Sequence, residues 1–129
     1  MKEIIKLVSV FMIIGSSYSI AKEVNLFTSR HYDSDVELYK KFTAKTGIKV
    51  NVVSGKAKAL EKRLLSEGKS SKADVYITVD AGALGSAKAK GIFQRINSKT
   101  LNSKIPANFR TSHWYCLLYT SDAADDRSC

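Results

Sequence analysis

Regular alternation of strand-like and helix-like segments is the feature that most limits what this chain can fold into. Residues 24–28, 48–53 and 74–79 are short β-prone runs. Helix-like patterns over 36–46, 57–66 and 82–90 follow them and end near Gly47, Gly68 and Gly91. Strands that alternate with helices of this length pair in parallel through right-handed crossovers. The sequence therefore predicts an α/β fold with an open, mainly parallel sheet and flanking helices.

The expected helices also carry expectations about caps and buried faces. Ser34 or Asp35 is expected to cap the first helix, whose apolar face is formed by Val36, Leu38, Tyr39, Phe42 and Ala44. Leu60, Leu64 and Leu65 are expected to point inward from the second helix.

The amino terminus has the build of a secretory signal peptide. Two lysines precede an uncharged run from Leu7 to Ile14, and small and polar residues follow up to Ala21. The apolar run is too short to span a bilayer. Residues 1–21 are therefore expected to be a signal peptide cleaved after Ala21, so that the chain is exported. Retention of the uncleaved segment, with the protein associated with the membrane, is the alternative.

The carboxyl-terminal segment, residues 116–129, breaks with the rest of the chain. It changes from a lysine-rich to an acidic composition and lacks periodicity. Read as codons, CLLYTSDAAD matches one reading frame of the transposon-end adapter used to prepare sequencing libraries. We therefore expect residues 116–129 to be a non-native adapter tail. The alternative is a natural tail closed by a disulfide between Cys116 and Cys129, as an exported protein could form.

Residues 22–115, the segment between these ends, form one small domain or part of one. They contain 18 basic and 8 acidic residues, a formal charge of +10. Such a charge fits nucleic acid, an anionic membrane or an anionic ligand. The lysines stand at helix-surface spacing, without a basic strip interleaved with aromatic residues, and this pattern favours solvated helix faces over nucleic-acid binding.

Candidate binding residues stand where the first strand gives way to the first helix. In open parallel sheets, ligands bind beyond the carboxyl ends of the strands. Three loops are expected there, at 29–33, 54–56 and 80–82, and the first of them contains Arg30, His31 and Tyr32. Their convergence at one edge predicts a ligand site.

The residue types in this loop point to a hard metal ion. A phenol has a pKa of about 10, but a highly charged cation such as ferric iron can displace its proton. His31 adds a nitrogen donor, and Arg30 could hold an anion or a ligand oxygen bidentately. Each residue also has a plainer interpretation, with His31 solvated or capping and Tyr32 packed over the first helix. No second His, Cys or carboxylate stands nearby at ligand spacing.

Several stretches of the chain resemble one family closely. The run from EVNLFTSRHYDSDVELYKKF through TGIKV and NVVSGK, then ADVYITVDAGAL, INSKTLNSKIPANFR and HWY, resembles the ferric-iron-binding periplasmic proteins of bacterial ABC transporters. These are members of the extracellular solute-binding protein family. The resemblance covers residues 23–115 and implies the amino-terminal lobe of a type II periplasmic binding protein, with iron clamped by tyrosines between two α/β lobes.

By this resemblance, His31 and Tyr32 match the metal ligands that the amino-terminal lobe contributes. Some relatives also supply a carboxylate from the loop where Asp80 stands, so Asp80, with Arg30, is a candidate for a supporting role. Ser54 departs from the glutamate of many relatives. The implied partners are Fe(III) and, for a full-length monomer in the periplasm, an inner-membrane ABC transporter permease. The alternative is a type II binding protein for an oxyanion or a polyamine. A secreted enzyme is less favoured because the sequence contains no catalytic motif.

Re-reading the locus from intact DNA tests the adapter interpretation. We expect CLLYTSDAADD to be replaced by a strand containing Gly-Leu, followed by roughly 200 further residues, since relatives have two lobes of typical domain size. Finding the same tail in genomic DNA assembled without such adapters would contradict this interpretation.

Overall fold

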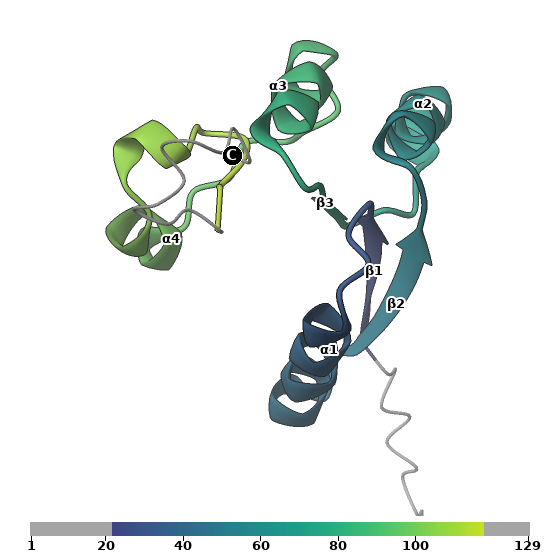
Figure 1. Cartoon of the computed structure of the whole chain (residues 1–129), viewed down its shortest axis with the longest axis vertical. Coiled ribbons are helices and arrows are strands. Elements are labelled where there is room, and N and C mark those ends of the chain that lie inside the picture. Colours follow the sequence, from purple (N-terminus) through teal and green to yellow (C-terminus); the bar gives the residue numbers. More distant parts are fainter. Residues whose placement is uncertain (1–21, 118–129) are drawn as a thin grey trace, which may run out of the picture.

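The computed structural model describes residues 22–117, whose centre is a three-stranded parallel sheet (Figure 1). The elements, in chain order, are β1 (Glu23–Thr28), α1 (Asp33–Thr46), β2 (Lys49–Ser54), α2 (Ala57–Glu67), a 3-10 turn (Gly68–Ser70), β3 (Val75–Ile77), α3 (Ala81–Ala89), α4 (Lys99–Lys104) and a second 3-10 turn (Ala107–Phe109). The strand order is β2-β1-β3. This arrangement confirms the expected open parallel α/β architecture.

Strand β1 is the centre of the sheet and pairs with both neighbours. It pairs with β2 along its whole length, from Glu23 opposite Lys49 to Thr28 opposite Ser54, and with β3 over its last three residues. Because strands cover both of its edges, its carboxyl half is the most buried part of the sheet. Leu26, Phe27 and Thr28 are at most 4% exposed.

Alternate side chains of the sheet face different helices. Phe27 packs with Leu60 and Leu64 of α2 to form the core, and Val53, Ala73, Tyr76 and Ile92 pack against it. Thr28, Val50 and Val52 have the opposite parity and lie on the side of α1. Helices α1 and α2 therefore cover opposite faces of the sheet, as right-handed crossovers to the two sides of β1 require.

The second helix corrects one expectation about the core. Leu60 and Leu64 are buried as expected, but Leu65 is 43% exposed. Consecutive residues of a helix point about 100° apart, so two adjacent leucines cannot both face a narrow core on one side.

Glu61 of the same helix is paired with Lys90 at the end of α3, and this hydrogen bond lowers the pKa of the Glu61 carboxyl.

Helix α1 begins earlier than expected, and its cap differs from the prediction. The residue at the cap position is Tyr32, whose side chain makes no capping hydrogen bond, so the prediction of Ser34 or Asp35 as the cap was wrong. Both residues lie inside the first turn, and the Asp35 carboxylate binds Arg30 instead of backbone amides. The end is as predicted, with Gly47 in the left-handed conformation at φ 71° and its N–H bonded to the Thr43 carbonyl.

The expected apolar face of α1 is largely uncovered within residues 22–117. Val36, Leu38 and Phe42 are 41–60% exposed, and no residue of this helix is buried. The residues expected to form one face in fact point in several directions. Some, such as Val36 and Tyr39, line a groove against the sheet, whereas Leu38 lies outside that lining.

Strand β3 is shorter than the expected run 74–79. It ends at Ile77, whose carbonyl accepts a hydrogen bond from the Ser29 N–H. Its partner β1 ends at Thr28, opposite Ile77, so Thr78 and Val79 have no ladder partner on β1 and lead into the loop before α3. Helix α3 and Gly91, which has φ 71°, lie within one residue of their expected positions.

Residues 92–117 add helix α4 and a short irregular closure, for which the sequence pattern carried no expectation. Arg110 joins this region by donating to the Ile105 carbonyl and to the Asn102 side chain, which also accepts from the Tyr115 hydroxyl. Cys116 is buried, and its N–H donates to the Phe109 carbonyl at 2.8 Å. The expected signal peptide and residues 118–129 of the expected tail lie outside the described residues. Across 22–117, no helix is long and apolar enough to cross a membrane.

A pair of adjacent leucines tests the core assignment. Leu64→Ala should lower the free energy of unfolding by about 2–5 kcal/mol because it opens a cavity beside Phe27. Leu65→Ala, the matched control, should cost no more than about 1 kcal/mol because its side chain is already half exposed. Urea denaturation followed by circular dichroism measures both. If Leu64→Ala leaves no folded baseline while Leu65→Ala keeps one, Leu64 still contributes more to stability than Leu65. Equal losses in the free energy of unfolding would contradict the core assignment.

Candidate functional site

The carboxyl ends of the three strands meet at one edge of the sheet. The Ser29 N–H donates to the Ile77 carbonyl at 3.0 Å, and the Gly55 N–H donates to the Thr28 carbonyl at 3.1 Å. These bonds tie the loop after β1 to the ends of β3 and β2. The loop that carries Arg30, His31 and Tyr32 therefore lies between the other two. The strand pattern predicted that the three loops converge, and the structure supplies their order.

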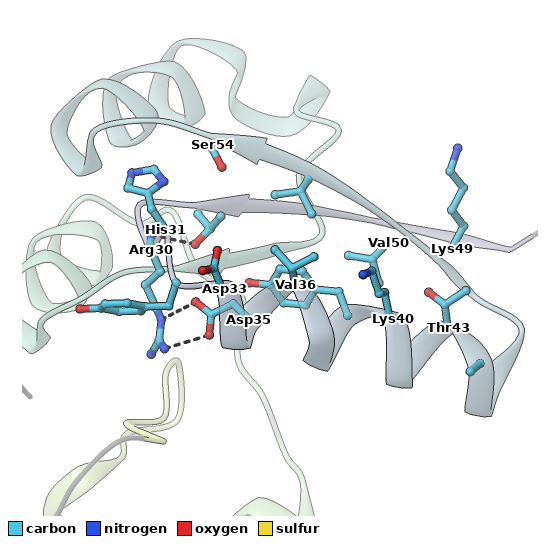
Figure 2. Close-up of a pocket in the computed structure, with 15 residues that line it drawn as sticks. Arg30, His31, Asp33, Asp35, Val36, Lys40, Thr43, Lys49, Val50 and Ser54 are labelled. Atoms are coloured by element: carbon cyan, nitrogen blue, oxygen red, sulfur yellow. Dashed lines mark hydrogen bonds and ion pairs between the residues drawn. The ribbon is translucent and has the colours of Figure 1, made fainter.

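His31 and Tyr32 present their side chains to solvent at this edge. Both are exposed, and the Tyr32 side chain is 58% accessible. In Figure 2 the imidazole of His31 points away from the Arg30–Asp35 pair. An imidazole and a phenol from adjacent residues are thus both accessible from solvent.

Arg30 faces inward and is engaged by the start of α1. Its Nε and Nη2 donate to the two carboxylate oxygens of Asp35 at 3.0 and 2.9 Å (Figure 2). Both side chains are largely shielded, at 15% and 14% exposure. The guanidinium also lies over the Tyr32 ring, 5.1 Å from its centroid. Two donors of the fork proposed to hold an anion are therefore already occupied by a carboxylate.

A second layer of polar contacts supports the loop from below. The Thr28 hydroxyl accepts a hydrogen bond from the Arg30 N–H at 3.0 Å. The phenol of Tyr39 on α1 also hydrogen-bonds Thr28. Burial raises the pKa of this phenol, and the nearby Asp35 charge raises it further, while Arg30 and the Thr28 bond act in the opposite direction. The Tyr39 phenol is therefore neutral at neutral pH.

Asp80 lies in the neighbouring loop, where it caps α3. Its Oδ1 accepts from the Ala83 N–H at 2.7 Å, and its carbonyl accepts from the Thr78 hydroxyl at 2.8 Å. This capping accounts for the aspartate structurally. One carboxylate oxygen is used by the helix, which leaves the second for any supporting role toward a ligand.

A groove of about 630 Å³ runs from this loop between α1 and β2. Arg30, His31 and Tyr32 line one end of it, and Ser54, at the end of β2, also borders it (Figure 2). Toward the other end the lining is mainly apolar or lysine-bearing, with Val50 and Lys49 from β2. Only the end at the loop therefore offers a set of metal-binding donors.

The fold brings some of the sequence-predicted site residues to one edge and turns others inward. Between residues 22 and 117, no three His, Cys, Asp or Glu side chains gather where they could hold a metal ion. The structure brings His31 and Tyr32 to one exposed edge and turns Arg30 away from solvent. Sequence reasoning missed the role of Asp35 as the partner of Arg30. The available signal was an acidic residue in the first turn of the following helix, but it was interpreted as a cap.

Known proteins resemble this chain in sequence over most of its length. No family model matches the chain. Iron uptake protein A1 of Synechocystis is 51% identical over 90 residues, which cover 70% of this chain and 25% of the relative. Iron uptake protein A2 of the same organism is 40% identical over 97 residues, which cover 74% of this chain and 27% of the relative. The chain thus spans about a quarter of the length of these curated relatives.

Solved structures agree with the sequence comparison. A Trichodesmium protein (IdiA, FutA) in complex with iron and citrate is 54% identical with a TM-score of 0.70, covering 72% of this chain and 30% of that one. A ferric binding protein from Campylobacter jejuni is 45% identical with a TM-score of 0.70, covering 71% and 30%. These matches confirm the expected fold class, part of a type II periplasmic binding protein. Over the part that the comparisons cover, this chain is similar to iron uptake and ferric binding proteins.

Proposed function

We propose that this chain carries one side of a ferric-iron site in a periplasmic iron-uptake protein. The observation that carries the proposal is the pair His31 and Tyr32, exposed side by side at the carboxyl edge of a sheet whose fold and sequence match ferric-binding proteins. Ferric iron stabilises a phenolate, and imidazole supplies a second donor. His31 and Tyr32 are the proposed ligands, and iron is the cargo that the protein delivers.

The same observations favour iron over the other ligands considered. An oxyanion site needs free donors, but the Arg30 fork is already bound to Asp35 at 2.9 and 3.0 Å. A polyamine site needs several uncompensated acidic side chains, but of the acidic residues that line the groove, Asp35 is already paired with Arg30. The relatives' names refer to iron. We infer a binding and transport role rather than catalysis, with export to the periplasm and delivery to an inner-membrane ABC transporter permease by a monomer.

The proposed site is completed by ligands outside the described residues. Two donors are too few to hold ferric iron tightly, because a multidentate site owes its affinity to several ligands fixed in advance. The relatives are about four times longer than the segment matched here. We propose that their additional length corresponds to a second lobe that supplies further tyrosines.

Substitution of Tyr32 in the full-length protein tests the assignment. Tyr32→Phe keeps the ring but removes the phenolate, so iron affinity should fall by more than the roughly 10–100-fold expected for loss of an outer contact. The visible phenolate-to-iron band should also change, with little loss of fold stability. His31→Ala should cost less, because imidazole is a softer partner for a hard cation. Competition with citrate and absorption spectroscopy measure these effects.

Tyr115→Phe is the matched control for that experiment. The Tyr115 hydroxyl bonds Asn102, far along the chain from the loop, so its loss should leave both the iron affinity and the band unchanged. Iron affinity that stays the same in Tyr32→Phe would return Tyr32 and His31 to structural roles and refute the proposed site.

The chain as given provides a second test. We expect the mature fragment beginning at Lys22 to be marginally stable, because α1 and the β3 edge are uncovered within the described part. It should not retain ferric iron against citrate. Loading with ferric citrate, desalting and measuring bound iron with the visible spectrum decides this. Stoichiometric iron with a phenolate band would show that one lobe suffices.

A further inference from the structure

The contacts around Tyr32 form a closed cycle through Arg30 and Asp35. The Asp35 N–H donates to the Tyr32 carbonyl at 3.0 Å, the Asp35 carboxylate binds Arg30 through both oxygens, and the Arg30 guanidinium lies over the Tyr32 ring. This cycle of contacts links the backbone of Tyr32 to its side chain through Arg30 and Asp35. We propose that Arg30 and Asp35 form a positioning pair that holds the Tyr32 phenol ready for iron, an inference that rests on the proposed function.

Tyr32 needs such support because its own surroundings are open. The side chain is 58% exposed, and an exposed tyrosine can exchange among staggered rotamers. A planar guanidinium stacked on one face of the ring favours a single orientation. A ligand fixed in advance loses less conformational freedom on binding, so the metal is held more tightly.

Arg30 can act in this way because it is itself fixed. Its two bonds to Asp35 use the fork geometry that only arginine has, and its N–H is held by Thr28 at 3.0 Å. Asp35 in turn lies in the first turn of α1 and is 14% exposed. Through Arg30 and Asp35, the Tyr32 ring is connected to the first turn of α1 and not only to its own loop.

The pair also keeps the site electrostatically compatible with a cation. An unpaired guanidinium close to Tyr32 would repel a trivalent ion. Asp35 cancels that charge within 3.0 Å, so Arg30 can support the ligand without opposing the metal. This balance distinguishes the pair from a site that recruits an anion, where the arginine would have to be free.

A similar trio elsewhere in the chain supplies a matched control. Arg63 lies over the Phe27 ring at 4.8 Å from its centroid and pairs with Glu67 at 2.6 Å. It combines an arginine, a carboxylate and an aromatic ring as Arg30 does, but it lies on α2, on the other face of the sheet. Arg63→Lys and Glu67→Gln therefore measure what such contacts contribute to stability alone.

The test uses Arg30→Lys and Asp35→Asn in the full-length protein. Lysine keeps the charge but cannot form the fork or stack as a plane. Each variant should weaken ferric-iron affinity, measured by citrate competition, by roughly 10-fold or more, as loss of a contact that orients a metal ligand does. The visible band should shift as well. Arg63→Lys and Glu67→Gln, whose pair is more exposed and joined by one bond, should lower the thermal stability less and leave iron binding intact.

Two further measurements separate positioning from a general structural role. In a Tyr32→Phe background, Arg30→Lys should have no further effect on iron affinity, because the pair acts through the lost phenolate. In the metal-free protein, NMR should show the Tyr32 ring signals moving toward averaged values in Arg30→Lys. Equal losses in both backgrounds, or unchanged ring signals, would overturn the positioning role. If only the proposed iron site is wrong, Tyr32→Phe will leave the iron affinity unchanged, while the Tyr32 ring signals will still move in Arg30→Lys.

Discussion

The central position of β1 is the constraint on which the rest of this structure depends. Its six residues pair in parallel with β2, and its last three also pair with β3. Parallel pairing places all three carboxyl ends at one edge, so the loops that follow them are neighbours although they are far apart in sequence. Burial of Phe27 against Leu60 and Leu64 fixes which face of β1 meets α2. Thr28, one residue later, therefore faces α1.

That parity accounts for the way the candidate site is held. Because Thr28 faces α1 at the end of β1, its hydroxyl meets the Arg30 N–H and the Tyr39 phenol. Residues 29–32 lead into α1, and the Arg30 guanidinium binds the Asp35 carboxylate in the first turn of this helix. His31 and Tyr32 remain outside this polar layer. The exposed donors are thus consequences of an ordered layer of contacts beneath them.

The uncovered surfaces of the described region agree with the partial coverage of its relatives. Val36, Leu38 and Phe42 of α1 are substantially exposed, and β3 has a free edge within residues 22–117. The chain matches about a quarter of the length of its curated relatives. An open sheet edge and an unburied helix face within residues 22–117 accompany this partial coverage.

The sequence by itself determined the order of the three strands and the first three helices, because β-prone runs, helical patterns and the stop glycines are local signals. It also located His31 and Tyr32 after the first strand, and the resemblance suggested what they bind. Only the tertiary structure decided what is buried and what is paired. Leu65 and Leu64 are adjacent and chemically identical, so packing against one side of the sheet had to choose between them. Asp35 resembled a helix cap until the turn after β1 brought Arg30 to it, because a carboxylate binds whichever donor the fold delivers.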